Sequence, residues 1–158
     1  DPTVITDILP QAMSSKTVIK RQLLTEVVEI DFLKSIGSDK VKHSGGTLLE
    51  HLIGTSEELK KLGAPEYLQD AGLFHSVYGT VYFMPEGGLV DNRQVVKDLI
   101  GEDAEEIAYW FCILDLPRGE QILKFKGQLK KDLLSLDTAN QEEQSVNNMM
   151  TWEEAYDL

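Results

Sequence analysis

The spacing of apolar residues constrains the fold of this chain more than any other feature. In several successive stretches they recur every three or four positions, the period of a helix that buries one face. Glycine or proline separates these stretches, and both residues are typical of helix ends. The pattern therefore predicts an all-α fold, organised as a single helical bundle domain.

The predicted helices have recognisable start and stop signals. The first runs from Ser14 to about Ile36 and ends at Gly37. Thr47 opens the second, since its spacing to Glu50 is that of a capping box, and this helix ends before Gly63. The other predicted elements are a helix over 65–78, a short extended segment near 80–90, helices over 91–100 and 104–116, a stretch over 119–127 that is ambiguous between strand and linker, and a helix over 128–136.

Composition and charge divide the chain into three predicted parts. Residues 1–12 contain two prolines and form an N-terminal arm, and residues 13–138 form the helical domain. Residues 139–158 are polar and acidic, with Trp152 and Tyr156 as possible anchors. Two interpretations of this tail remain open: a segment that docks on a protein partner, or a strap that closes over its own domain.

The charge balance excludes some classes of partner. Fifteen basic residues stand against 27 acidic ones, a net charge of −12, so phosphate backbones and anionic lipid surfaces would repel the chain. No apolar run approaches the roughly 20 residues of a membrane-spanning helix. We therefore expect a soluble protein that binds neither nucleic acid nor membrane. Its single cysteine, Cys112, favours a reducing compartment, and the first residues show no signal peptide. We expect an intracellular location, cytoplasmic or in an organelle after removal of a targeting segment.

Polar groups at inward helix positions are the main functional signal. His75 lies within the apolar face of its helix, in the stretch GLFHSVYGT, and His51 lies at the edge of the apolar stripe of the preceding helix. Asp115 falls on the apolar face of the helix predicted over 104–116, and His43 precedes the second helix. A buried polar group needs a partner. Imidazole and carboxylate groups together suit zinc, iron or manganese, whereas a single inward histidine is more often bonded to a carbonyl.

Three strings, HSGGTLLEHLIGT, GAPEYLQDAGLFHSVYGT and LIGEDAEEIAYWFCILD, resemble a branch of the HD-domain superfamily over about residues 43–116. That resemblance implies an all-helical metal protein. It implies His51 as the first ligand, His75 as the second and Asp115 as the last acid, with His43 as a possible helper. Ser76 stands where the family's His-Asp pair has its Asp, and a neutral hydroxyl is a poor ligand. The outcomes left open are a mononuclear site, a different metal geometry, or a degenerate fold without metal.

Two functions are most compatible with these residues, beside a third possibility, a pocket that binds a small apolar or cofactor ligand without chemistry. The first is an enzyme with one divalent transition metal (iron, manganese or zinc) that acts on a small molecule as a hydrolase or an oxygenase. In this hypothesis Tyr78 and Arg93 are catalytic, and the substrate-binding residues are Ser76, Thr80 and Thr55. The second is a degenerate HD-like binding or assembly module without catalysis.

Overall fold

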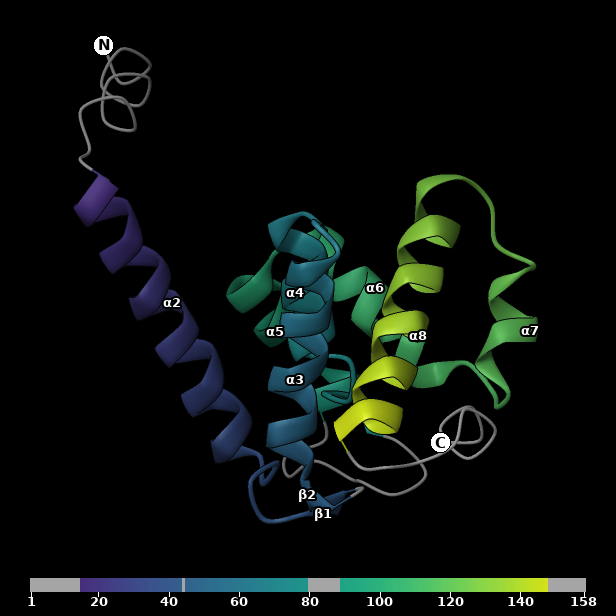
Figure 1. Cartoon of the computed structure of the whole chain (residues 1–158), viewed down its shortest axis with the longest axis horizontal. Helices are drawn as coiled ribbons and strands as arrows, with labels where there is room; N and C mark the ends of the chain where they lie inside the picture. The colour runs from purple at the N-terminus through teal and green to yellow at the C-terminus, as the bar shows by residue number, and fades with distance from the viewer. Residues whose placement is uncertain (1–14, 44, 80–88, 148–158) are drawn as a thin grey trace, which may run out of the picture. The chain divides into compact units, whose positions relative to one another are not determined.

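The computed structural model describes residues 15–43, 45–79 and 89–147 (Figure 1). The chain divides into two compact units, residues 1–32 and residues 33–158. We call the second the helical unit. The boundary falls within helix α2 (Ser15–Ser35), which agrees closely with the first predicted helix. The described part is all-α apart from one two-stranded sheet, so the predicted fold class is confirmed.

The helical unit opens with a small antiparallel sheet that leads directly into a helix. Strands β1 (Lys42–His43) and β2 (Gly46–Thr47) pair Lys42 with Thr47 and His43 with Gly46. The later elements are α3 (Leu48–Lys61), α4 (Glu66–Leu73), the 3-10 turn η1 (Leu89–Asp91), α5 (Arg93–Ile100), α6 (Glu102–Ile113), α7 (Arg118–Ile122) and α8 (Gly127–Asn147).

Helix α3 starts where its capping signal predicts. Thr47 is the N-cap residue, and its Oγ1 accepts a hydrogen bond from the backbone N–H of Glu50 at 3.2 Å. A cap of this kind stabilises a helix by about 1 kcal/mol, because it satisfies an amide that has no partner within the helix. The helix ends at Lys61, just before Gly63 with its left-handed φ of 76°. The local sequence therefore sets both ends of α3.

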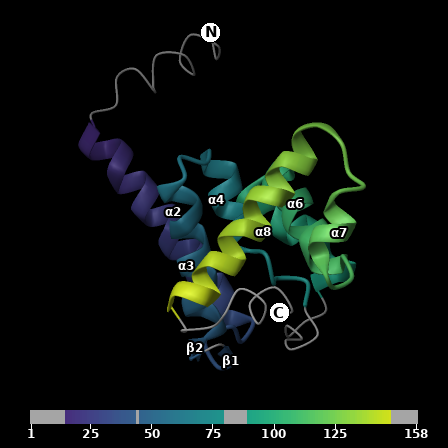
Figure 2. The same cartoon turned by 45° about the vertical axis from the view of Figure 1, so that its right-hand side comes forward.

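Helices α3 and α8 form the centre of the helical unit. Helix α8 packs against α3 and α6, and Figure 2 shows it crossing obliquely over both. Helix α4 contacts α3, α6 and α8, while α5 packs on α6 and α7 packs on α8. Burying each large apolar side chain in this core contributes roughly 1.5–3 kcal/mol. The core side chains with almost no exposed surface include Leu52, Leu59, Phe74, Val96, Phe111, Ile122, Leu133 and Leu136.

Several element boundaries differ from those expected from the sequence. Helix α4 ends at Leu73, and residues 74–78 form turns rather than a continuous helix to Gly79. Helix α5 begins one residue after Asn92, so Asp91 belongs to the preceding 3-10 turn. The stretch over 119–127 is part of the short helix α7 and the turn after it, not a strand. The expected extended segment near 80–90 lies almost wholly outside the described residues.

Helix α8 continues well beyond the boundary expected at residue 138. Residues 139–147, which the sequence assigned to the acidic tail, belong to this helix. They bury Ala139, Asn140, Glu143 and Gln144. Because three of these four side chains are polar, no hydrophobic pattern marks the end of the helix. The rest of the expected tail and the arm at 1–12 lie outside the described residues.

No helix in the described part of the chain combines the length and the apolar character needed to cross a membrane.

Truncation tests whether the last turns of α8 belong to the folded core. A chain ending at Thr138 loses the buried residues of 139–147, including a carboxylate that pairs with a buried histidine of α3. We expect it to lose about 3–5 kcal/mol of unfolding free energy, measured by urea denaturation, because breaking a buried ion pair costs that much. A chain ending at Asn147 is the control. Equal urea midpoints for the two chains would contradict the assignment.

Candidate histidine–carboxylate centre

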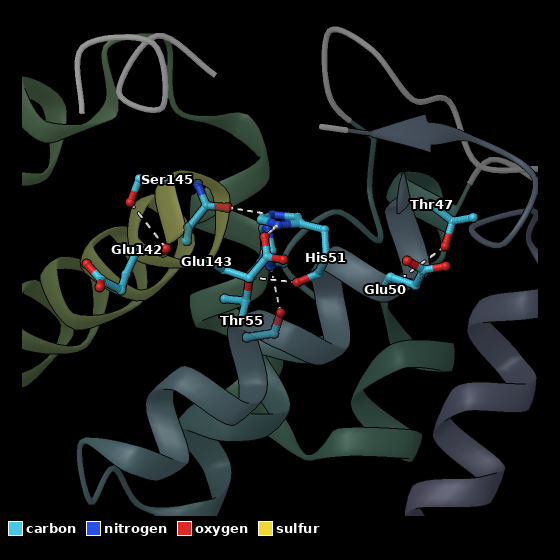
Figure 3. A network of polar contacts seen from close by, with 10 residues as sticks. Thr47, Glu50, His51, Thr55, Glu142, Glu143 and Ser145 are labelled. Atoms are coloured by element: carbon cyan, nitrogen blue, oxygen red, sulfur yellow. Dashed lines mark hydrogen bonds and ion pairs between the residues drawn. The ribbon is translucent and has the colours of Figure 1, made fainter. Parts of the chain in front are cut away.

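His51 on α3 is the middle of a buried polar cluster. Its side chain is almost fully buried, and both ring nitrogens have partners on α8. Nδ1 contacts a carboxylate oxygen of Glu143 (Figure 3), and Nε2 lies 2.7 Å from Oδ1 of Asn140. Both ring nitrogens thus lie against side-chain oxygen atoms of one helix, which ties His51 of α3 to α8.

The β1–β2 sheet places a second imidazole against the first. The ring of His43 stacks on that of His51, with 4.3 Å between centroids and 19° between planes. Because β2 runs directly into α3, the position of His43 is tied to the start of the helix that carries His51. Nδ1 of His43 is buried and makes no hydrogen bond within the described part of the structure. This nitrogen is therefore available to a further partner.

His75 supplies the third imidazole, from the turn that follows α4. Its ring meets that of His51 edge-on, with 5.1 Å between centroids, and it packs on Phe111 at 5.3 Å. Nδ1 donates a hydrogen bond to the carbonyl oxygen of Gly72 at 2.6 Å. This bond fixes the tautomer, so Nε2 carries the lone pair of the neutral ring. Three imidazoles and a carboxylate thus lie in one part of the interior.

Burial keeps two of these histidines neutral. Desolvation, and next the nearby His51, lower the pKa of His43 to about 4. The same two causes, with a smaller effect of the Arg118 charge, hold the pKa of His75 well below its ordinary value. Each ring therefore keeps a free lone pair at neutral pH, the form in which histidine acts as a metal ligand or a general base.

One face of α8 supplies the oxygen side of the cluster. Asn140, Glu143 and Gln144 have the i, i+3, i+4 spacing of one helix face, and all three are buried. Oε1 of Gln144 is buried and has no hydrogen-bond partner in the described residues. Nδ1 of His43 and Oε1 of Gln144 are the two buried side-chain polar atoms without a hydrogen-bond partner among the described residues.

The structure corrects the prediction for Asp115. Helix α6 ends at Ile113, and Leu114 has an extended backbone with ψ of 137°. Stepping by 100° per residue fails beyond that point, so Asp115 does not continue the face formed by Ala104 and Phe111. Its side chain is exposed. Asp115 is therefore not the inward acid of the cluster, and Glu143 of α8 takes that place.

Tyr78 and Arg93 meet at a different carboxylate. Tyr78 donates from its hydroxyl to Glu105 at 2.8 Å, and Arg93 donates to both oxygens of Glu105 at 2.5 and 2.9 Å. The guanidinium also lies 3.6 Å from the ring centroid of Tyr109. Desolvation and the Glu105 carboxylate raise the pKa of Tyr78, so its hydroxyl stays protonated. The two residues predicted to be catalytic therefore share a fully buried anchor on α6.

The three predicted substrate-binding residues have separate outcomes. Thr55 is fully buried and donates its hydroxyl to the carbonyl of His51 at 2.9 Å, one turn back along α3. Ser76 is buried in the turn next to His75. Thr80 lies outside the described residues. Thr55 and Ser76 are thus close to the cluster in the chain, but both are enclosed by protein.

Cys112 lies beside the turn that carries His75, and its thiol is unreactive. Its thiol donates to the carbonyl of His75 at 3.0 Å, and burial raises its pKa to about 12. A thiol that stays protonated at neutral pH is a poor nucleophile.

No three His, Cys, Asp or Glu side chains in residues 15–43, 45–79 and 89–147 already stand in an arrangement that could hold a metal ion. Within these residues Glu143 and Asn140 occupy both ring nitrogens of His51. The cluster contains the donor types of a metal site in a hydrogen-bonded arrangement.

The sequence analysis did not predict Glu143 and Asn140 as partners of His51, or Glu105 as the partner of Tyr78 and Arg93. A signal for α8 was present, because Leu133, Leu136, Asn140 and Glu143 follow one another at helical spacing. Extending the helix predicted over 128–136 by two turns would have placed Asn140 and Glu143 on its buried face. Glu105 has a similar signal, because it lies one turn before Ala108 on α6 and both residues are buried.

One family model matches the part of the chain that contains the three histidines. Residues 32–116, more than half of the chain, match the family model described as Domain of unknown function (DUF6817). The chain belongs to this family. The part matched to the DUF6817 model includes His43, His51, His75 and Glu105, whereas α8 with Asn140 and Glu143 lies outside it. Neither the curated proteins nor the solved structures contain a match.

The neutral state of His75 gives a pH prediction. Its pKa is lower in the folded than in the unfolded chain, so the unfolded chain binds the extra proton below about pH 6.5 and stability falls as the pH falls. We expect His75→Asn, whose amide preserves a donor toward Gly72, to reduce this loss by roughly 1 kcal/mol between pH 6.5 and 5.5. Urea unfolding of chelator-treated protein measures it. Parallel pH dependences of the two proteins would refute a neutral, buried His75.

Proposed function

We propose that the helical unit is a metal-dependent enzyme acting on a small molecule, with one divalent transition metal held by His43, His51, His75 and Glu143. The observation that carries the proposal is the gathering of three imidazole rings beside a buried carboxylate, with centroid separations of 4.3 and 5.1 Å. A core that needed only packing would use apolar groups here, because each buried polar group costs free energy unless it is paired.

The donor set fits a transition metal in chemical type. Nitrogen and carboxylate oxygen ligands suit zinc, iron and manganese. The hydrogen bond from His75 to the Gly72 carbonyl is the contact that commonly orients a metal-bound histidine. Nδ1 of His43 is buried and unpaired within the described structure, and a cation is one partner that would satisfy it.

Metal binding requires a local exchange of partners. His51 and Glu143 would give up their direct contact, so that each could bind the ion instead. Asn140 would remain on the other ring nitrogen and keep the imidazole in orientation. A bound metal of this kind lowers the pKa of a water molecule for hydrolysis or, as iron, binds dioxygen. The protein's own part is to orient the three rings and keep the site enclosed.

The proposal includes membership of the HD-domain superfamily, with one change in the expected ligands. His51 and His75 keep the roles that the resemblance implies, and Glu143 replaces Asp115 as the last acid. Ser76 leaves no carboxylate beside His75 in the chain, so the site is mononuclear. Tyr78 and Arg93 then act as supports for the turn that carries His75, since both are bound to Glu105. The single cysteine suits a reducing, intracellular compartment.

Metal analysis tests the proposal. Protein purified without added metal should contain close to one equivalent of iron, manganese or zinc, measured by plasma mass spectrometry. We expect His51→Ala and Glu143→Gln to lower affinity for Zn²⁺ or anaerobic Fe²⁺ at least 10-fold in titrations. Asp115→Asn is the matched control, because that carboxylate is exposed, and it should bind as the wild type does.

Two results would refute this function. One is a wild-type protein that contains no stoichiometric metal and takes up none in titration. The other is loss of binding in Asp115→Asn while Glu143→Gln binds normally.

The second candidate is a binding or assembly module that has lost metal chemistry. The arrangement of His51 favours it, since both ring nitrogens are already satisfied by Glu143 and Asn140. The replacement of an expected Asp by Ser76 points the same way. In that case the cluster stabilises the contact between α3 and α8, and the acidic segment after α8 is the candidate docking segment for a protein partner. The metal titration separates the two candidates.

A further inference from the structure

Gly54 occupies an interior position of α3 that a helix would ordinarily fill with another residue. Glycine lowers helix stability because it has more conformational freedom to lose on folding. Among the helical unit's glycines, Gly37, Gly45, Gly63, Gly79, Gly101 and Gly127 have left-handed backbone conformations. Gly54 does not, so its backbone geometry gives no reason for glycine. The reason must lie in what packs against its α-carbon.

The side chain of Glu143 lies directly against Gly54. A β-carbon at position 54 would stand 2.7 Å from Cγ, 3.0 Å from Oε1 and 3.2 Å from Cδ of Glu143. Carbon atoms do not approach to 2.7 Å in proteins, so any side chain at position 54 would force Glu143 to move. Glu143 cannot move freely, because its carboxylate contacts Nδ1 of His51 one turn earlier on α3 (Figure 3).

Two other glycines are also crowded, but by residues that are not members of the histidine–carboxylate cluster. A β-carbon at Gly72 would meet Cδ1 of Leu59, and one at Gly46 would meet Oε2 of Glu50. The atom nearest to Gly72 belongs to the apolar core and the one nearest to Gly46 is the end of a glutamate side chain, whereas at Gly54 the nearest atom is Cγ of Glu143. Of the glycines whose surroundings are described, Gly54 is the one crowded by a member of the histidine–carboxylate cluster.

We infer that Gly54 is a positioning residue: the absence of a side chain there lets the carboxylate of α8 pass over α3 and reach His51. His51 and Gly54, one turn apart on α3, thus form the surface that receives Glu143. This positioning holds in the metal-free protein. Its consequence for metal binding rests on the function proposed above.

The test replaces Gly54 by alanine and observes His51 by NMR in chelator-treated protein. In the wild type, the proton between Nδ1 and the carboxylate should give a far-downfield ¹H resonance, assigned by its loss in Glu143→Ala. We expect Gly54→Ala to abolish this resonance or move it upfield by at least about 1 ppm, since the carboxylate must withdraw from the ring.

The control is Ser56→Ala on the same helix. Ser56 donates its hydroxyl to the carbonyl of Gln69 at 2.9 Å, a partner on α4 that is not a member of the cluster. This variant weakens the packing of α3 on α4 and should keep the downfield resonance. A folded Gly54→Ala protein with the wild-type resonance would overturn the inference.

A double variant keeps the inference testable if Gly54→Ala does not fold. In the Glu143→Ala background, adding Gly54→Ala should cost far less thermal stability than it does in the wild type, because the alanine at position 54 then has nothing to displace. An equally large loss on adding Gly54→Ala to Glu143→Ala would overturn the inference.

Metal titration separates the two proposals. If Glu143 is a ligand, Gly54→Ala should weaken Zn²⁺ binding about 10-fold or more, and Ser56→Ala should not. A wild type that binds no Zn²⁺ while Gly54→Ala still loses the resonance would refute the metal site and leave the positioning role supported. Wild-type Zn²⁺ affinity in Gly54→Ala, with Glu143→Gln impaired, would overturn the positioning role.

Discussion

The contact between His51 and Glu143 is the interaction on which the arrangement of the helical unit depends. It joins α3 to α8 across 92 positions of the chain, in a region where both side chains are almost fully buried. A carboxylate left alone there would be strongly unfavourable, so the two helices must keep the register that brings the groups together. Gly54 makes that register sterically possible, and Asn140 holds the other side of the ring.

The remaining parts of the cluster are fixed by short connections to this pair. The β1–β2 sheet carries His43 because it runs directly into α3, and the turn after α4 carries His75. A second buried carboxylate, Glu105, anchors that turn through Tyr78. The interior is therefore organised by two carboxylates, on α6 and α8, each of which receives donors from another element. Buried carboxylates of this kind must keep their partners, because an unpaired buried charge is strongly unfavourable.

Local sequence signals predicted much of this structure. Helical periodicity and glycine boundaries located α2 and α3, the Thr47 cap formed as expected, and His51 and His75 are buried as their positions indicated. Predictions failed where the signal was not local. The apolar periodicity that predicts an inward Asp115 does not continue past the end of α6 at Ile113, and the last turns of α8 lack an apolar pattern because their buried face is polar. Pairing of Glu143 with a histidine 92 positions away leaves no trace in apolar spacing.

The most direct test of the centre is X-ray absorption spectroscopy of the protein loaded with one equivalent of Zn²⁺. We predict a first shell of nitrogen and oxygen atoms at about 2.0–2.1 Å, with the outer-shell scattering of at least two imidazole rings. Replacing Glu143 by glutamine should alter that first shell, while replacing Asp115 by asparagine should not. A zinc spectrum without imidazole scattering would contradict the claim that His43, His51 and His75 form one centre.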